Sequence, residues 1–275
     1  MIIEAGQARS LGSDGDTWLR FGEEAKAPGA WAGRRLLFAA DKPAFELSFW
    51  CGTCQFVFRR LEGANEGGSL EALQERLTQG LDDLNDDVIQ QFGSALPLGD
   101  YLPILLEVAP RLVSPAQPED YFAHEQVDTW GLESFWGLPV YPRTPYYRTF
   151  ETSVDTDAHM YEFIVPMVPP SWNARSRVRE FEQLLDAGSQ ATAVAVSILD
   201  VCQPASDLGP DCHAHWALTH FLIDGHHKME AAANSGGPIR LLTLLSVRDG
   251  LASAEQVARV PEIRSRPQAI RRSGQ

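Results

Sequence analysis

Five consecutive residues near the end of the chain, Asp224, Gly225, His226, His227 and Lys228, combine side chains that could do chemistry. A carboxylate can hold a metal ion or accept a proton, an imidazole can donate or accept a hydrogen bond, and an ammonium group supplies positive charge. The backbone N–H groups at the start of a helix attract anions. If a helix begins at these residues, they form an anion-binding site.

The flanking residues predict the elements that would hold this site. Residues 217–223 and 239–247 are largely apolar, which indicates strands buried on both faces. Between them, residues 229–233 carry an apolar stripe at helical spacing, and the glycines and proline of 236–238 end that helix. The connection is just long enough for a right-handed parallel crossover. The five residues are then expected where a strand ends and a helix begins.

The run I-D-G-H-H-K-x-x-A-A at residues 223–232, followed by a glycine and a strand, resembles the signature of a known superfamily. That superfamily contains sulfiredoxin, the chromosome-partition protein ParB and the free-serine kinases, and its strand, glycine elbow and helix bind nucleotide phosphates. The resemblance covers residues 192–247. It implies that Gly225 lets the backbone approach the phosphates, and that His227 and Lys228 contact them.

Departures from the superfamily pattern disfavour some of the functions that the resemblance implies. Sulfiredoxins have a nucleophilic cysteine at the place of His226, so reduction of a sulfinic acid is not expected. Lys228 stands where the family usually has arginine, which keeps the charge but loses bidentate geometry. The net charge of -14, from 37 acidic and 23 basic residues, disfavours a ParB-like hold on nucleic acid phosphates.

The residues alone leave two interpretations of the elbow open. In the structural one, Asp224 only caps the helix, and His226 and His227 are packing or surface residues. In the functional one, Asp224 orients Mg²⁺ or accepts a proton from a substrate hydroxyl, and His226 takes part in proton transfer. A histidine in the first turn should be neutral, because the helix dipole disfavours a cation there. Glu230, one turn further along, could orient an imidazole or be an ordinary exposed helix residue, and the second interpretation is preferred.

The WCGTC sequence contains Cys51 and Cys54, whose spacing suits a dithiol redox site or two zinc ligands. The zinc interpretation needs further ligands, for which Cys212, His215 and His213 are candidates, with the first two preferred. A thioredoxin-like site would need a βαβ arrangement, which the strand-like residues after the motif do not predict. A third interpretation is that the thiols are free in a tight turn.

Five of the seven histidines lie between positions 213 and 227. A metal-dependent hydrolase with an open coordination position is therefore another alternative, although no ligand motif such as HExxH is present. A histidine-rich rim around an anion site is the preferred interpretation.

The composition predicts a cytoplasmic protein that binds neither membranes nor nucleic acids. No apolar stretch approaches the roughly 18 residues of a membrane helix, and the first residues lack the basic start and apolar core of a secretory signal. Four cysteines in 275 residues are too few for a secreted disulfide scaffold.

The predicted fold class is α+β. Short strands between residues 17 and 60 predict an antiparallel β-meander, and leucine stripes at 70–77 and 81–92 predict helices. Residues 102–108 predict one more short helix. The C-terminal part is expected to form a small α/β unit of the sulfiredoxin and ParB type.

Within that unit, residues 161–168 predict a strand, and Asn173 is the expected cap of a helix. The β-branched residues of 192–201 predict the strand that precedes the elbow. Ser253 and Gln256 have the spacing of a capping box for a last helix.

Four parts of the chain are expected. Residues 1–110 hold the meander and helices, and 111–158 form an ordered but irregular segment, rich in proline and in aromatic residues that mainly serve the core. Residues 159–260 form the α/β domain, and 261–275 a basic, solvated and partly disordered tail.

Together, these features predict an ATP-binding protein that acts with Mg²⁺ as a phosphotransferase on a small hydroxylated metabolite. Asp224 and His226 would be catalytic, and Gly225, His227 and Lys228 would hold the phosphates. One alternative is a non-enzymatic nucleotide sensor or interaction protein with a structural zinc site. The second alternative is a metal-dependent hydrolase.

Overall fold

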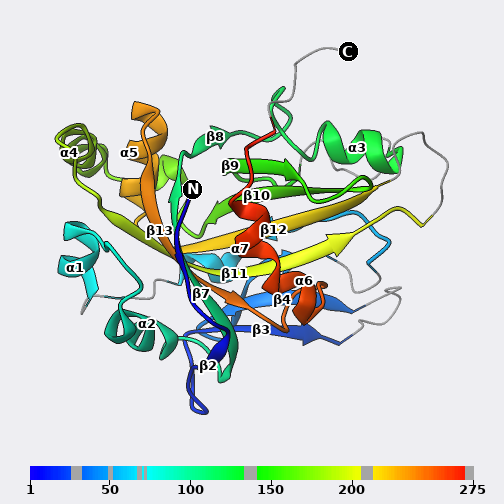
Figure 1. The fold of residues 1–275 in the computed structure, drawn as a ribbon, viewed down its shortest axis with the longest axis horizontal. Coiled ribbons are helices and arrows are strands. Elements are labelled where there is room, and N and C mark those ends of the chain that lie inside the picture. Colours follow the sequence, from blue (N-terminus) through cyan, green and yellow to red (C-terminus); the bar gives the residue numbers. More distant parts are fainter. Residues whose placement is uncertain are drawn as a thin grey trace.

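A large mixed sheet forms the centre of the fold (Figure 1). The structure is a computed structural model that describes residues 1–25, 33–48, 52–66, 70, 73–132, 141–205 and 213–269. Nine strands of these ranges form the sheet in the order β1-β7-β13-β11-β12-β10-β9-β8, with β2 paired to β7. They are β1 (Ile2–Ala5), β2 (Arg9–Leu11), β7 (Gly99–Val108), β8 (Arg111–Val113), β9 (Tyr146–Ser153), β10 (Ala158–Pro166), β11 (Thr192–Cys202), β12 (Ala214–Asp224) and β13 (Ile239–Ser246).

A smaller antiparallel sheet packs against one face of the large one. Its strands pair in sequence order, which confirms the predicted β-meander. Phe45 of this sheet lies against Phe221 of β12, with ring centroids 5.1 Å apart, and Arg35 pairs with the buried Asp200 of β11. The strands are β3 (Leu19–Glu24), β4 (Arg34–Ala39), β5 (Lys42–Leu47) and β6 (Phe58–Arg60).

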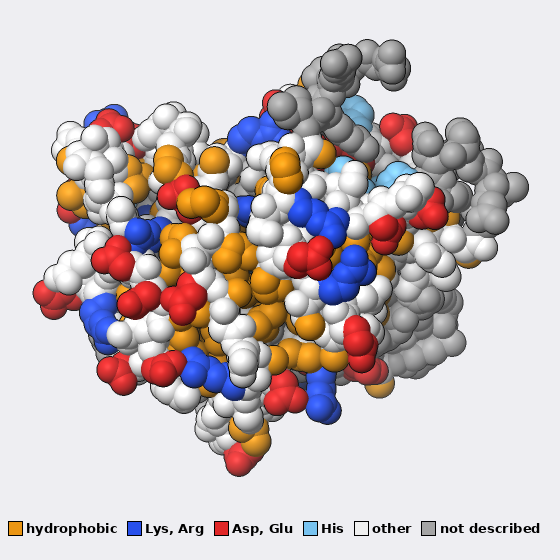
Figure 2. All heavy atoms as spheres, viewed as in Figure 1, with side chains coloured by type: hydrophobic (Ala, Val, Ile, Leu, Met, Phe, Trp, Pro, Cys, Tyr) orange, Lys and Arg blue, Asp and Glu red, His pale blue; other side chains and the backbone are white. Residues whose placement is uncertain are grey.

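The buried residues of the helices between β6 and β7 lie in the same layer as the smaller sheet, whereas the helices that follow β12 pack on the opposite face of the large sheet. Met229, Val257 and Ile263 belong to the apolar layer on that face, and Figure 2 shows hydrophobic side chains gathered in its middle with charged groups around them. No helix of the described ranges is long and apolar enough to cross a membrane. The helices are η1 (Glu62–Asn65), α1 (Gln74–Gln79), α2 (Asp86–Gly93), α3 (Glu125–Trp130), η5 (Pro170–Trp172), α4 (Arg175–Asp186), α5 (His226–Ser235), α6 (Ala254–Ala258) and α7 (Val260–Arg264).

The elbow connects two strands that are not parallel, so the predicted parallel crossover is wrong. β11 pairs antiparallel with β12 and parallel with β13, and it lies between them. The helix α5 packs against α4 at the end of the sheet and does not carry the chain back to the start of β12 (Figure 1). The chain therefore re-enters the sheet at the end where it left, and β13 runs antiparallel to β12.

Two local predictions are also wrong. Residues 102–108 belong to strand β7 and not to a helix. Their continuous apolar run suits a strand buried on both faces, and such a run cannot be distinguished from a buried helix by periodicity. The segment 111–158 is not irregular, because it contains β8, α3 and β9. Its aromatic residues do serve the core, since Tyr121 and Tyr146 are completely buried.

The combination of helices and strands is that of an α+β fold, and the large sheet takes strands from several of the expected parts. Strands β7, β9 and β12 come from three different parts and share one sheet. The predicted tail begins as helix α7, in which Arg264 is only 3% exposed. Its Nε donates to Oε1 of Glu162 at 2.8 Å, so a buried carboxylate on β10 holds this residue inside. The predicted capping box of Ser253 and Gln256 is confirmed.

Candidate functional site

The elbow lies where the sequence predicts it, with β12 ending at Asp224 and α5 beginning at His226. Gly225 between them has a φ of +92°, in the left-handed region that favours glycine. A Cβ atom at this position would lie 2.8 Å from the Cβ of Ala193 on β11. The turn and the close approach of β11 therefore require this glycine, independently of any ligand.

A pocket of about 240 Å³ opens at the elbow. Helices α4 and α5 lie side by side at one end of the sheet, with α1 nearby (Figure 1). The pocket contains four of the five residues singled out from the sequence, and His226 is not among its lining residues. It is lined by Gln74 and Thr78 of α1, Arg177 and Phe181 of α4, and Asp224, Gly225, His227 and Lys228 of the elbow.

Lys228 forms a buried part of the pocket wall. Its side chain is about 6% exposed, and Nζ donates to the backbone oxygens of Leu77 at 3.2 Å and Thr192 at 3.0 Å. Burial lowers the pKa of this ammonium group, and Asp224, whose Oδ2 lies 3.6 Å away, opposes the shift. Because two backbone oxygens hold this ammonium group and Asp224 pairs with it, Lys228 supplies a charge that is fixed in position. The predicted direct contact with phosphate is not supported by this geometry.

Asp224 also lines the pocket, with Oδ2 lying 3.6 Å from Nζ of Lys228, and 24% of its side chain is exposed. The carboxylate is thus accessible to a ligand while one of its oxygens is oriented by a charged neighbour. A single carboxylate in such a position can hold Mg²⁺ together with phosphate oxygens, or accept the proton of a hydroxyl group.

The other donors of the pocket come from His227 and Arg177. The backbone N–H of Ala174 donates to Nε2 of His227 at 3.2 Å, and burial, followed by Arg177, lowers the pKa of this imidazole. The ring is therefore neutral at pH 7, with its proton on Nδ1. The half-exposed Arg177 lies over the ring of Phe181 at 4.7 Å and donates through NH1 to Glu180. Its guanidinium has further N–H groups for a ligand.

His226 has structural contacts that explain its position outside the pocket. Its Nε2 accepts the N–H of Val168 at 3.2 Å, and the ring also bonds to the backbone of Leu222. Burial, and to a smaller extent His227, lowers the pKa of His226 to about 4. Both ring nitrogens are occupied in joining the end of β10 to the elbow, so the predicted catalytic role is not supported.

Glu230 is buried, and its predicted exposure is wrong. It accepts hydrogen bonds from Nδ2 of Asn173 at 2.7 Å and from NH1 of Arg175 at 2.5 Å. The helix α4 packs on this side of α5, which covers the carboxylate. Asn173 does not cap α4, whose N-cap is Ala174. These contacts hold α4 against α5 and thereby place Arg177 at the pocket.

Of the predicted zinc ligands, His215 has both ring nitrogens hydrogen-bonded. The hydroxyl of Thr129 donates to the backbone oxygen of Glu125, so it accepts from Nε2 of His215 at 3.0 Å. The hydroxyl of Tyr121 then donates to Nδ1 at 2.7 Å. His215 is therefore a neutral core residue in this arrangement.

Cys54 is disulfide-bonded, so it is neither a free thiol nor a zinc thiolate in this form. The other cysteine ligands of the predicted set, Cys51 and Cys212, lie outside the described residues. Within the described ranges, no group of three His, Cys, Asp or Glu residues could hold a metal ion. A zinc site at these positions stays a prediction.

The histidines that are close in sequence are spread along β12. A strand rises about 3.3 Å per residue, so His215 and the elbow lie roughly 30 Å apart at opposite ends of this strand. His213 lies against His215, with ring centroids 4.8 Å apart, and not at the pocket. Of the histidines predicted to form a rim around the anion site, His227 is therefore the one that lines the pocket.

A second polar group lies inside the large sheet and crosses five neighbouring strands. Ser197 Oγ lies 2.6 Å from Nδ1 of His220, whose Nε2 lies 3.4 Å from Oε1 of Glu162. Thr149 and Thr243 extend the row at its two ends. The order of serine, histidine and carboxylate is similar to a hydrolase triad, but Ser197 is completely buried. The row therefore forms hydrogen bonds between strands in the interior of the sheet and is not accessible to a substrate.

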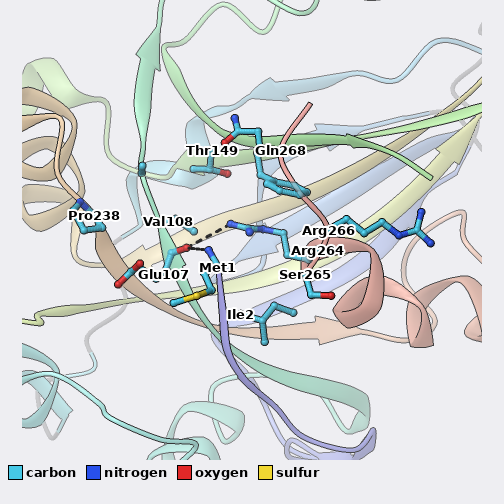
Figure 3. A pocket seen from close by; sticks show the side chains of 12 residues that line it. Met1, Ile2, Glu107, Val108, Thr149, Pro238, Arg264, Ser265, Arg266 and Gln268 are labelled. Atoms are coloured by element: carbon cyan, nitrogen blue, oxygen red, sulfur yellow. Dashed lines mark hydrogen bonds between the residues drawn. The ribbon is translucent and has the colours of Figure 1, made fainter. Parts of the chain in front are cut away.

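A larger pocket of about 340 Å³ lies beside this row (Figure 3). Arg264 reaches across it from α7 to the backbone oxygen of Glu107, and its Nε is paired with Glu162. Arg266 donates to Glu262 at 2.6 Å. Both guanidinium groups thus face carboxylates, and none of the described helices begins at this pocket. It lacks the converging backbone donors of the elbow.

Comparison of the chain with protein-family models, with curated proteins and with solved structures finds no match. The resemblance to the sulfiredoxin and ParB superfamily stays a prediction.

Four pocket residues, Gln74, Thr78, Arg177 and Phe181, are not identified as site residues by the sequence pattern. They belong to helices that precede the elbow by about 50 to 150 residues. The one available signal is the group of alternate arginines at 175–179, which cannot be assigned to the elbow without knowing that α4 packs on α5.

Proposed function

We propose that the protein binds the phosphate groups of ATP with Mg²⁺ at the elbow pocket and transfers a phosphoryl group to a small hydroxylated molecule. The observation that supports this most is the convergence of a helix N-terminus, a buried ammonium, a guanidinium and a carboxylate on one pocket. The predicted cytoplasmic location would supply both ATP and Mg²⁺.

In this proposal, the pocket residues have distinct roles. The first-turn N–H groups of α5, Nδ1–H of His227 and the guanidinium of Arg177 bind phosphate oxygens, and Lys228 adds charge from behind. Asp224 orients Mg²⁺ or accepts the proton of the acceptor hydroxyl. The acceptor oxygen forms a bond to the γ-phosphorus, the bond to the β,γ-bridging oxygen breaks, and ADP leaves with that electron pair.

The size of the pocket restricts what it holds. Pockets that enclose whole drug-sized ligands have volumes of about 300–1,000 Å³, and the elbow pocket has about 240 Å³. It has room for a phosphoryl group and a small acceptor, so the adenosine of ATP would lie outside. Binding energy should therefore depend mainly on the contacts to phosphate.

Isothermal titration of the full chain with ATP and Mg²⁺ tests the proposal. Replacement Arg177→Ala should weaken binding by roughly 10- to 100-fold, the value of one charge-assisted hydrogen bond. Arg179→Ala is the matched control, because it removes the same charge from an exposed position of α4 outside the pocket. No heat at millimolar ATP, or equal losses in both variants, would contradict the proposal. Binding without phosphoryl transfer to any alcohol tested would favour the nucleotide-sensor alternative.

A further inference from the structure

The part of the pocket wall formed by α1 is polar but carries no charge. Gln74 and Thr78 are four residues apart and lie on the same side of this helix. The hydroxyl of Thr78 donates to the backbone oxygen of Gln74 at 2.8 Å, so its lone pairs remain able to accept a hydrogen bond. The side-chain amide of Gln74 has no hydrogen-bond partner among the described residues and can both donate and accept.

The position of α1 is determined by contacts behind the pocket. Lys228 donates to the backbone oxygen of Leu77, the residue that precedes Thr78. The side chain of Leu77 is completely buried. Just after the helix, the N–H of Leu81 donates to the hydroxyl of Thr192 at 3.0 Å. The amide and hydroxyl are thus held next to the phosphate-binding side of the pocket.

The charged residues of the pocket all have roles in the proposed function. Arg177 and Lys228 balance phosphate charge, and Asp224 serves the metal ion or the proton. A carboxylate on the acceptor would meet no further cation, and an amine would meet no further acid, so each would be desolvated without a partner.

We propose that the acceptor is a small neutral polyol whose hydroxyl groups bind to Gln74 and Thr78. This inference rests on the proposed function and names the substrate class of the same site. The product is the phosphate monoester of that polyol, and it occupies the phosphate-binding and neutral parts of the pocket together.

Titration of the full chain with three probes tests the inference: inorganic phosphate, glycerol 3-phosphate and phosphoethanolamine. Glycerol 3-phosphate should bind about tenfold more tightly than either of the other two, because it alone adds hydroxyl contacts without a charge. Gln74→Met removes the amide at nearly constant length, and it should weaken glycerol 3-phosphate binding about fivefold while leaving phosphate binding unchanged. Gln79→Met is the matched control on the same helix, since Gln79 is exposed and outside the pocket.

The possible failures can be distinguished. If none of the three probes binds, the phosphate site and the proposed function are both contradicted. If phosphate binds but glycerol 3-phosphate binds no more tightly, or if the two glutamine variants behave alike, only the polyol inference is overturned. Tighter binding of phosphoethanolamine would show that the acceptor carries an amine and would also overturn it.

Discussion

Replacement of Glu162 by glutamine removes one partner of the ion pair that fastens α7 to the large sheet. The carboxylate is completely buried, and it accepts Nε of Arg264 at 2.8 Å and the hydroxyl of Thr149. Burial by itself would raise the pKa of Glu162, but Arg264, assisted by His220, holds it well below its usual value. The folded protein therefore keeps a negative charge at this position over the whole neutral range.

The loss of stability in Glu162→Gln can be calculated from the unpaired charge that the replacement leaves in the interior. The guanidinium of Arg264 remains 3% exposed without its carboxylate, and loss of one partner of a buried pair costs about 3–5 kcal/mol. The double replacement Glu162→Gln with Arg264→Met removes both charges and should be less destabilising than the sum of the single replacements by about 2 kcal/mol or more. Equilibrium unfolding in urea, followed by circular dichroism, measures both quantities.

The pH dependence gives a second measurement on the same variant. Because the pKa of Glu162 is lower in the folded than in the unfolded state, its stabilisation is present above the unfolded pKa of roughly 4.3. It is lost as the pH falls below that value. The difference between wild type and Glu162→Gln should therefore be constant from pH 7 to pH 5 and decrease below it. A cost below about 1 kcal/mol at pH 7, or additive single replacements, would refute the reasoning.

Two further replacements test the elbow. Gly225→Ala should lower the free energy of unfolding by about 2–4 kcal/mol, because alanine there has both a positive φ and a Cβ contact of 2.8 Å. Gly236→Ala should lower it by about 1 kcal/mol, because Gly236 has a positive φ but a Cβ there would meet nothing within 4 Å. Equal costs in urea unfolding would rule out the close approach of β11. The pKa of His226 in the folded state, about 4, lies below its value in the unfolded state. The wild type should therefore lose up to about 3 kcal/mol of stability between pH 6.5 and pH 4, as the unfolded state takes up the proton. His226→Gln should not show this loss. Parallel thermal unfolding curves for wild type and His226→Gln across this range would contradict the assigned burial.

Local features of the fold could be predicted because the residues that determine them are close in sequence. The elbow depends on an apolar run, a glycine at a positive φ and a helical stripe within about 20 residues. The β-meander and the capping box of Ser253 depend on similarly short segments. The strand β7 could not be predicted in the same way, because an apolar run becomes a strand only when edges such as those of β1 and β13 are available to it.

The sequence by itself determined that Asp224, Gly225 and an α-helix start follow a buried strand, since these depend on backbone preferences of adjacent residues. Only the tertiary structure decided what this elbow offers to a ligand. The packing of α4 on α5 places Arg177 at the pocket, and the backbone oxygens of Leu77 on α1 and Thr192 on β11 accept hydrogen bonds from Lys228. The physical reason is that a side chain becomes a ligand-binding group only if its hydrogen-bonding atoms are left unoccupied by residues distant in the sequence.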